Sequence, residues 1–451
     1  MEEIYRKKPW IKLYPSEVPA EVEIPSKLIT EAFDEATDKW KKKTALIFYG
    51  NKIRYGELRE SVDRFANALF HLGVKKGDRV SMLMLNSPEY IIAFYGILKV
   101  GGIAVSISPV YVSSEIKHQL QNSESETIIC QDMLYGTVEK TGVKQKNVIL
   151  TSIADSLPKV KKLIGKSILR GVYQKMAVPS PMIYEKEGFH RLKDLIDKYP
   201  PNPPNVEINS EDVITLQYTG GTTGLPKGVM MNHKNMIANL TQYHTFYSFF
   251  EEGKEVYMAY MPFYHAGGQF VGPVYGLCYG HTLIVITTPE PDEIINSINR
   301  YKVTHFFGAP SLYEILKDYE KTDRVRWRQL KICISTADAL NEATAEDWND
   351  RTGVVLHDFW AATETGFTLA NPLGKQKPGS VGIPVCNTLA AILDPEKDEF
   401  YPPGEIGELV ISGPQTTTGY WRNPDATKEC ESIIKNTRWW RTGDLARMEA
   451  D

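Results

Sequence analysis

The chain has 451 residues, of which 42% are apolar and 24% are charged, and its formal net charge is −4. This length and composition indicate a soluble globular protein with two or three packed subdomains, because one hydrophobic core rarely serves so many residues. The near-neutral charge provides no broad basic field. It therefore argues against nucleic acid as a partner and leaves any affinity for membranes or phosphates to local segments.

The five cysteines are scattered, odd in number and never spaced as Cys-x-x-Cys. This pattern favours a reducing compartment and argues against a zinc site. The first residues carry charged side chains in place of the apolar core of a signal peptide, and no apolar run is long enough to span a bilayer. We therefore expect a cytoplasmic protein.

Strands and helices alternate after a polar, proline-punctuated segment over residues 1–40, which we expect to wrap the surface. Runs of β-branched and apolar residues predict strands over residues 45–49, 79–85 and 103–107. Helical spacing predicts a helix over residues 55–72, and Ser87 followed by Pro88 predicts the start of another helix. This alternation indicates an α/β fold, layered around a largely parallel sheet.

Residues 156–178 form a basic segment without any acidic residue. On a helical wheel of about 100° per residue its apolar side chains form one face. Four basic side chains cluster on the opposite face: Lys159, Lys162, Lys166 and Arg170. One interpretation is a surface helix that docks on anionic lipid at the inner face of the membrane. The other is a solvated helix packed on its own domain, and the sequence does not separate the two.

The glycine-rich stretch over residues 218–228 reads Tyr-Thr-Gly-Gly-Thr-Thr-Gly-Leu-Pro-Lys-Gly. It is predicted to be a loop between two strands, followed by a helix that starts at Met236 with Asn235 as its N-cap. Glycines let backbone amides approach an anion, while threonine hydroxyls and a lysine add donors and charge. The loop therefore indicates polyphosphate binding. A Walker A loop is excluded because Lys227 opens no helix, which leaves a plain glycine-rich hairpin as the alternative.

This stretch resembles the signature loop of the adenylate-forming superfamily, which comprises acyl-CoA synthetases, luciferases and peptide-synthetase adenylation domains. Further motifs of the superfamily follow in order, so the resemblance extends over about residues 40–451. It implies two layered α/β subdomains packed together and a small distorted β-barrel. We place the three parts at residues 1–205, 206–370 and 371–451, with a stiff proline-rich linker at the first boundary.

The resemblance implies roles for the phosphate loop. The loop would bind the β- and γ-phosphates of ATP, and Thr219 and Lys227 would take part in catalysis. The loop residues assigned to the nucleotide are Thr219, Gly220, Gly221, Thr222, Thr223, Gly224 and Lys227. Thr222 is also expected to contact a metal ion.

Residues 358–366, Asp-Phe-Trp-Ala-Ala-Thr-Glu-Thr-Gly, resemble the superfamily pattern aromatic-Gly-x-Thr-Glu. The resemblance implies that Trp360 stacks on adenine and that Thr363 bonds the α-phosphate. It also implies that Glu364 holds Mg²⁺, a hard cation that prefers oxygen ligands. Thr363 and Glu364 would therefore be catalytic. The other residues of the motif assigned to the nucleotide are Asp358, Phe359 and Ala361.

Two further stretches are implied in nucleotide binding. Residues 335–340, Ser-Thr-Ala-Asp-Ala-Leu, stand where the superfamily usually has Ser-Gly-Gly-Ala-Pro-Leu, and they contribute Ala337 and Asp338. Residues 439–445, Trp-Trp-Arg-Thr-Gly-Asp-Leu, contribute Asp444. By resemblance its carboxylate accepts hydrogen bonds from both ribose hydroxyls.

The acyl substrate is assigned by two other motifs. Residues 261–265, Met-Pro-Phe-Tyr-His, resemble the aromatic-histidine motif of the superfamily. The resemblance implies that His265 borders the acyl and pantetheine channels and is catalytic, against the alternative of a structural histidine. Ala361 stands where acetate-specific relatives have a tryptophan that closes the pocket floor, which implies room for a longer chain. The loop that resembles the superfamily's acyl-pocket loop contributes Gly308, Ala309 and Pro310.

These motifs predict an ATP-dependent, AMP-forming fatty acid–CoA ligase. Its substrates would be a medium- or long-chain fatty acid, ATP and coenzyme A, with Mg²⁺ as cofactor, and a homodimer is left open. Two alternatives stay open: an aryl-acid or peptide-synthetase adenylation domain, and a nucleotide- or acyl-AMP-binding module without turnover. Superfamily members continue through a hinge into a mobile domain of about a hundred residues that supplies a catalytic lysine. We therefore expect this chain to be the large domain and to lack full activity by itself.

Overall fold

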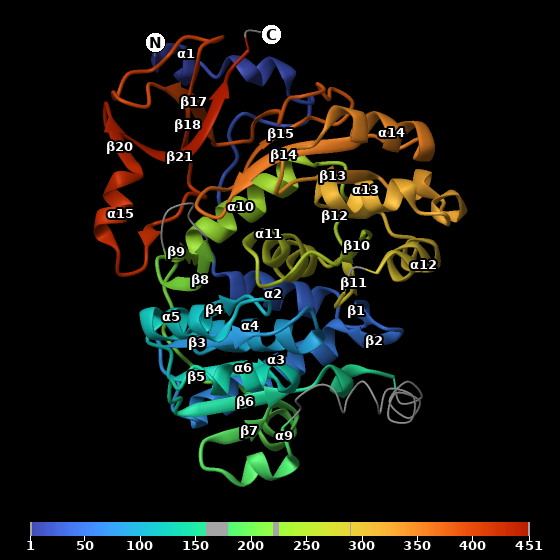
Figure 1. Cartoon of the computed structure of the whole chain (residues 1–451), viewed down its shortest axis with the longest axis vertical. Coiled ribbons are helices and arrows are strands. Elements are labelled where there is room, and N and C mark those ends of the chain that lie inside the picture. The colour runs from blue at the N-terminus through green and yellow to red at the C-terminus, as the bar shows by residue number, and fades with distance from the viewer. Residues whose placement is uncertain (1, 159–178, 220–224, 289, 450–451) are drawn as a thin grey trace. The chain divides into compact units, whose positions relative to one another are not determined.

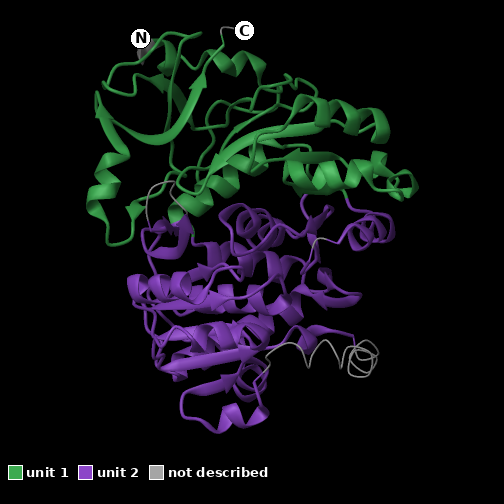
Figure 2. Ribbon diagram, viewed as in Figure 1, with its two compact units in different colours: residues 1–27, 234–251, 304–451 green, residues 28–233, 252–303 purple. Residues whose placement is uncertain are grey.

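The computed structural model describes residues 2–158, 179–219, 225–288 and 290–449. These residues form two compact units (Figure 2). Unit 1 comprises residues 1–27, 234–251 and 304–451. Unit 2 comprises residues 28–233 and 252–303. The three parts expected from the sequence divide the chain differently, and they stay a prediction.

Unit 2 contains a mostly parallel sheet with the strand order β9-β8-β4-β3-β5-β6-β7 (Figure 1). Neighbouring strands from β8 to β7 pair in parallel, whereas β8 and β9 pair antiparallel. Strands β4, β5 and β6 are buried along their whole length, as expected for a parallel sheet covered on both faces. The strands are β3 (Arg79–Leu83), β4 (Ile103–Ile107), β5 (Thr127–Gln131), β6 (Asn147–Thr151), β7 (Phe189–Arg191), β8 (Val213–Thr219) and β9 (Lys227–Asn232).

A second group of strands in unit 2 has the order β10-β11-β1-β2. Its members are β10 (Val256–Ala259), β11 (Thr282–Val285), β1 (Thr44–Phe48) and β2 (Asn51–Arg54). The helices of unit 2 are α2 (Ile29–Lys39), α3 (Tyr55–His71), α4 (Pro88–Lys99), α5 (Ser113–Ser123), α6 (Tyr135–Glu139), α9 (Leu192–Lys198), α11 (Ala266–Gln269), the π-helix η5 (Phe270–Gly276) and α12 (Pro291–Tyr301). Short 3-10 helices are η2 (Asp132–Leu134), η3 (Ile153–Ser156) and η4 (Pro181–Glu185).

Helix α4 lies at the centre of the core of unit 2. Every one of its residues is buried, which is typical of a helix that packs between layers. The side chain of Ser87 accepts a hydrogen bond from the backbone N–H of Tyr90, and Pro88 occupies the first turn. The predicted start of this helix is therefore confirmed.

The carboxyl end of α4 carries a charge into the interior. Lys99 Nζ lies 2.7 Å from Asp34 Oδ1 and 2.6 Å from Asp63 Oδ1. Arg59 lies 2.9 Å from Asp34 Oδ1 and 2.6 Å from Asp63 Oδ2. These four residues, which we call the buried ion cluster, connect α2, α3 and α4 through fixed charge pairs.

Unit 1 contains a mixed sheet with the order β16-β15-β14-β13-β12, in which β12, β13 and β14 are parallel. A second, antiparallel sheet has the order β17-β18-β21-β20 and lies in the part of the chain for which a small distorted β-barrel was expected. The strands are β12 (His305–Gly308), β13 (Ile332–Ser335), β14 (Leu356–Ala362), β15 (Gly366–Ala370), β16 (Ile383–Pro384), β17 (Leu389–Leu393), β18 (Ile406–Ser412), β19 (Gly419–Tyr420), β20 (Glu431–Ile434) and β21 (Thr437–Arg447). The helices are α1 (Glu2–Arg6), α13 (Pro310–Asp318), α14 (Glu342–Thr352) and α15 (Pro424–Glu429), with the 3-10 helices η1 (Pro9–Leu13), η6 (Thr322–Arg324) and η7 (Trp327–Gln329).

The helix after the phosphate loop corrects one prediction. Helix α10 (His233–Phe246) begins at His233, so Asn235 lies in its first turn and is not its N-cap. The side-chain amide of Asn235 instead donates to the backbone oxygens of Pro414 at 2.9 Å and Thr416 at 3.0 Å. A local capping signal was therefore misread, because the amide is used by a segment far away in the sequence.

The N-terminal segment holds more structure than the expected surface wrap. Residues 1–40 contain α1, η1 and α2, and they bury Trp10, Tyr14 and Phe33. The α/β fold class with layered parallel sheets is confirmed. The basic segment lies outside the described residues from 159 to 178, so both of its interpretations stay predictions. Within the described part of the chain, none of the helices has the length and apolar character needed to cross a membrane.

Candidate functional site

The frame of the phosphate loop is an antiparallel pair of strands in unit 2. Thr219 at the end of β8 lies opposite Lys227 at the start of β9. Helix α5 anchors both ends of the loop: the Tyr218 hydroxyl donates to Asn122 Oδ1 at 2.7 Å, and His118 Nε2 lies 3.2 Å from the Pro226 carbonyl oxygen. The two strands predicted to flank the loop are confirmed. The loop residues Gly220, Gly221, Thr222, Thr223 and Gly224 lie outside the described part of the chain.

The aromatic-histidine motif also lies in unit 2 and is held by Asn86. The Asn86 side-chain amide donates to Tyr260 O at 3.2 Å and Met261 O at 2.9 Å, and its oxygen accepts from Phe263 N at 2.7 Å. His265 directly precedes α11 and keeps an exposed face, while burial of the rest of the ring lowers its pKa. The imidazole is therefore predominantly neutral at pH 7, at the end of a rigidly held loop.

Two parallel strands of unit 1, β12 and β13, end at the same level, and the neighbouring β14 continues beyond them to Ala362. The register places Gly308 of β12 opposite Ser335 of β13, and Ser335 opposite Asp358 of β14. Ala309 and Pro310 follow Gly308 and begin helix α13. Ligands of open α/β sheets bind beyond the carboxyl ends of the strands, so this edge suits the assigned pocket and nucleotide residues.

The stretch after β13 shows why the superfamily has glycine there. Ala337 has a φ of +74°, in the left-handed region that favours glycine, and both Ala337 and Asp338 are exposed. Thr336 Oγ1 donates to Phe359 O at 3.2 Å, and its backbone N–H donates to Gly308 O at 3.0 Å. The turn is therefore held in a strained conformation by bonds to two neighbouring strands.

Strand β14 presents several of the predicted site residues. Its pairing with β15 shifts register between Trp360 and Ala361, and Ala361 is exposed. Burial raises the pKa of Asp358 to about 7, so its carboxyl titrates near neutrality. Phe359 is buried, and its ring lies 5.3 Å from Phe307 and 5.3 Å from Phe367 between ring centroids. The ring of Phe359 thus belongs to the core.

Two predicted nucleotide residues from distant motifs meet in unit 1. The indole Nε1–H of Trp360 donates to Asp444 Oδ2 at 2.9 Å. Trp360 is half-buried and Asp444 is exposed, so both remain accessible from one side. Adenine and ribose are neighbouring parts of one nucleoside, and a stacking ring hydrogen-bonded to a carboxylate matches the two predicted roles.

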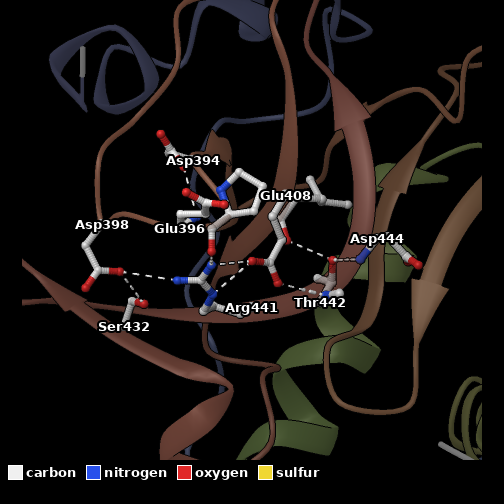
Figure 3. Close-up of polar contacts among 11 residues, drawn as sticks. Asp394, Glu396, Asp398, Glu408, Ser432, Arg441, Thr442 and Asp444 are labelled. Carbon is white, nitrogen blue, oxygen red and sulfur yellow. Dashed lines mark hydrogen bonds and ion pairs between the residues drawn. The ribbon is translucent and has the colours of Figure 1, made fainter. Parts of the chain in front are cut away.

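Behind Asp444 a polar network supports the part of β21 that carries it, where the pairing with β18 shifts register (Figure 3). Glu408 accepts from Arg441 Nε at 2.8 Å through one oxygen and from Gly443 N at 3.0 Å through the other. Thr442 Oγ1 donates to Leu409 O at 2.8 Å and accepts from Asp444 N at 3.1 Å. The sequence offered no signal for Glu408, because its partners lie on another strand.

Glu364 lies on the turn between β14 and β15. Its backbone oxygen accepts from Thr417 N at 2.7 Å, and its Oε1 accepts from the Tyr420 hydroxyl at 2.9 Å. Burial, together with the neighbouring Glu364 charge, raises the pKa of Tyr420, so this hydroxyl stays a donor. Thr363, next to Glu364, is half-buried. Tyr420 is a site residue that sequence reasoning missed.

The surroundings of Glu364 fit a hard cation that also binds substrate phosphates. A carboxylate with one oxygen oriented by a tyrosine offers the oxygen chemistry that Mg²⁺ prefers. Among the described residues no group of three or more His, Cys, Asp and Glu side chains is placed to hold a metal ion.

Comparison with known proteins identifies the class. The sequence profile of the family described as "AMP-binding enzyme" matches residues 33–421. The chain belongs to this family, that is, to the adenylate-forming superfamily that its motifs resemble. It is 32% identical to a long-chain-fatty-acid–CoA ligase of Bacillus subtilis (strain 168), over 98% of this chain and 79% of the relative.

Two further matches are similar in kind. A long-chain-fatty-acid–CoA ligase of Salmonella typhimurium is 33% identical over 99% of this chain and 79% of its own length. Among solved structures, a long-chain-fatty-acid-CoA ligase from Archaeoglobus fulgidus aligns with a TM-score of 0.81 and 24% identity, covering 97% of this chain and 84% of that chain. The match to this solved structure shows that the two chains share a fold.

Proposed function

We propose that the protein is an ATP-dependent, AMP-forming fatty acid–CoA ligase. The observation that carries the proposal is the Trp360–Asp444 hydrogen bond, which joins two nucleotide motifs that are far apart in the sequence. Glu364 follows on the same β14–β15 hairpin. The long-chain-fatty-acid–CoA ligases that match nearly the whole chain support a fatty acid as the acyl substrate.

The reaction has two displacements. A carboxylate oxygen of the fatty acid bonds to the α-phosphorus of ATP, and the bond to the bridging oxygen breaks, so pyrophosphate leaves. The thiolate of coenzyme A then bonds to the acyl carbon, and AMP leaves with the electron pair. Both steps depend on positioning and on neutralisation of developing charge, and neither needs a nucleophilic side chain.

The proposed residue roles follow the superfamily. Thr219 and Lys227, with the loop residues between them, bind the β- and γ-phosphates. Trp360 stacks on adenine and Asp444 accepts from the ribose hydroxyls, while Thr363 donates to the α-phosphate. Further nucleotide contacts are assigned to Ala337, Asp338, Asp358 and Ala361.

Magnesium, when bound, neutralises charge on the phosphate oxygens. In this proposal Glu364 holds the ion through its carboxylate, and Thr222 is assigned as a second protein contact. Tyr420 orients the carboxylate of Glu364.

His265 and the strand-end residues are assigned to the acyl substrate. Gly308, Ala309 and Pro310 line the pocket, and the small side chain of Ala361 leaves its floor open. His265 borders the passage for the fatty acid and the pantetheine arm. A cytoplasmic location, contact of residues 156–178 with the inner membrane face, and a homodimer remain proposals of the same kind.

A pyrophosphate-release assay tests this function in a version of the protein that also carries the mobile domain expected from the superfamily, and the kinetic measurements below use the same version. It compares acetate, octanoate, palmitate and benzoate, with and without coenzyme A. The expected result is release that depends on ATP and Mg²⁺ and is fastest with octanoate or palmitate, with an acyl-CoA thioester as product. Fastest release with benzoate would favour an aryl-acid enzyme. AMP binding without release for any acid would favour a binding module and contradict the proposal.

A further inference from the structure

A buried polar network in unit 2 lies between β8, which leads into the phosphate loop and is called the phosphate-loop strand, and residues 261–265, which we call the histidine loop. It comprises Tyr90 on α4, Ser106 on β4, Gln217 on β8 and Gln269 on α11. Their exposed fractions are 0%, 3%, 4% and 1%. Buried polar groups destabilise a protein unless they are hydrogen-bonded, so the bonding pattern among them is informative.

The acceptors determine the direction of each bond. The Tyr90 hydroxyl donates to Phe263 O at 2.6 Å, because a carbonyl oxygen only accepts. Ser106 Oγ, at 3.0 Å from the Tyr90 oxygen, must then be the donor to it. Gln269 Nε2 donates to the Tyr90 oxygen at 3.0 Å. Burial raises the pKa of Tyr90 to about 12, so the hydroxyl keeps its proton.

Ser106 extends the network to the strand that carries the phosphate loop. Its oxygen accepts from Gln217 Nε2 at 3.4 Å and from Gln269 Nε2 at 3.4 Å. Ser106 also lies opposite Gln217 in the β4–β8 pairing. Gln217 is two residues before Thr219, and Phe263 is two residues before His265. The two hydroxyls of Tyr90 and Ser106 therefore connect Phe263 of the histidine loop with the strand that leads into the phosphate loop.

We infer that Tyr90 is a positioning residue, whose hydroxyl sets the placement of His265 relative to the phosphate-loop strand. Asn86 already holds the histidine loop at Met261 and Phe263 N. Tyr90 adds the contact at Phe263 O and reaches β8 through Ser106. Gln269 supports the same link, because its backbone N–H donates to His265 O at 2.9 Å and its side chain donates to both Tyr90 and Ser106. The inference rests on the proposed function, because His265 is assigned to the acyl and pantetheine passage.

Tyr90→Phe removes one oxygen and keeps the ring in place. It leaves the Phe263 carbonyl and the Ser106 hydroxyl without their shared partner. The matched control is Tyr95→Phe on the same helix. Tyr95 is also 0% exposed, and its hydroxyl donates to Pro273 O at 2.9 Å, away from both loops.

The first readout is kinetic. Tyr90→Phe should lower kcat/KM for the fatty acid roughly 10- to 100-fold at saturating ATP, because small misplacements of catalytic groups have effects of this size. The Kd for AMP should stay the same, and Tyr95→Phe should change neither quantity. An equal fall in both variants would mean a general loss of packing and would overturn the inference.

The second readout is the double variant with His265→Ala. If Tyr90 acts through His265, adding Tyr90→Phe to His265→Ala should cause no further loss of kcat/KM, because the effects of two residues that act together are not additive. Losses that multiply would show that Tyr90 does not act through His265.

The third readout does not need turnover. Modification of His265 by diethyl pyrocarbonate, followed by peptide mass spectrometry, should be several-fold faster in Tyr90→Phe than in the native chain or in Tyr95→Phe. Equal rates in all three would contradict the inference. If no carboxylate supports pyrophosphate release, the proposed function fails, while this measurement still decides the role of Tyr90.

Discussion

The Tyr420–Glu364 hydrogen bond gives a quantitative prediction for the metal site. Tyr420→Phe keeps the ring and removes the hydroxyl that donates to Glu364 Oε1 at 2.9 Å. The carboxylate would then be free to rotate away from the orientation that a cation needs. Loss of a group that orients a metal ligand typically lowers metal affinity 10- to 100-fold, which corresponds to about 1.4 to 2.7 kcal/mol.

The assay is a magnesium titration of pyrophosphate release at saturating ATP and fatty acid. The half-saturating Mg²⁺ concentration should rise 10- to 100-fold in Tyr420→Phe. Binding of AMP in the presence of EDTA, measured by calorimetry, should not change, because only the metal carboxylate loses a partner. Glu364→Gln should abolish the magnesium-dependent reaction and likewise keep AMP binding.

Tyr401→Phe is the matched control, since the hydroxyl of Tyr401 bonds the carboxylate of Asp394 elsewhere in unit 1. It should leave the magnesium titration unchanged. If Tyr420→Phe also leaves the magnesium titration unchanged, or weakens the binding of AMP as much as that of Mg²⁺, Glu364 does not hold the metal through a carboxylate oriented by Tyr420.

Three further predictions concern nucleotide binding and stability. Asp444→Ala should weaken the binding of both ATP and AMP by about 2 kcal/mol, because charge-assisted hydrogen bonds to the ribose are lost. Asp398→Ala, on the far side of Arg441, should leave both affinities unchanged. If calorimetry finds the same affinities in Asp444→Ala as in the native chain, Asp444 is not part of the ribose site. Lys99→Met should reduce the free energy of opening of α4, measured by native-state hydrogen exchange, by about 3 kcal/mol, because the buried carboxylate of Asp63 and the half-buried carboxylate of Asp34 lose a partner. The control is Lys39→Met, which breaks the exposed ion pair with Glu252 and should reduce the same free energy of opening by less than about 1 kcal/mol. A similar reduction in both variants would refute the role of the buried ion cluster. Burial raises the pKa of Glu89 from 4.5 to about 7 in the folded chain, so the folded state holds a proton that the unfolded state releases. Relative to Glu89→Gln, the native chain should therefore lose about 3 kcal/mol of stability as the pH rises from about 4.5 to 7 and nothing further above it; parallel pH profiles would contradict this.

Local chemistry was sufficient for much of the fold. The start of α4 at Ser87 and Pro88 could be predicted because a cap and a proline act within one turn. The strands around the phosphate loop could be predicted because apolar runs and glycines encode strand and turn directly. The same short-range logic failed at Asn235, whose amide bonds Pro414 and Thr416 instead of its own helix.

The motifs also indicated which residues would carry the chemistry, because their order and residue types are specific. They did not indicate what holds those residues in place. Tyr420 and Glu364 are 56 positions apart, and Trp360 and Asp444 are 84 apart, yet each pair is joined by one hydrogen bond. No periodicity or spacing within a segment encodes such a pairing.

What the sequence determined by itself is therefore the superfamily, the alternation of elements and the identity of the candidate residues. The tertiary structure decided which side chains orient them: Tyr420 for Glu364, Glu408 for the part of β21 before Asp444, and Tyr90 for the histidine loop. The physical reason is that a hydrogen bond depends on distances of about 3 Å and on direction. Those are set only when strands and helices from distant parts of the chain have packed.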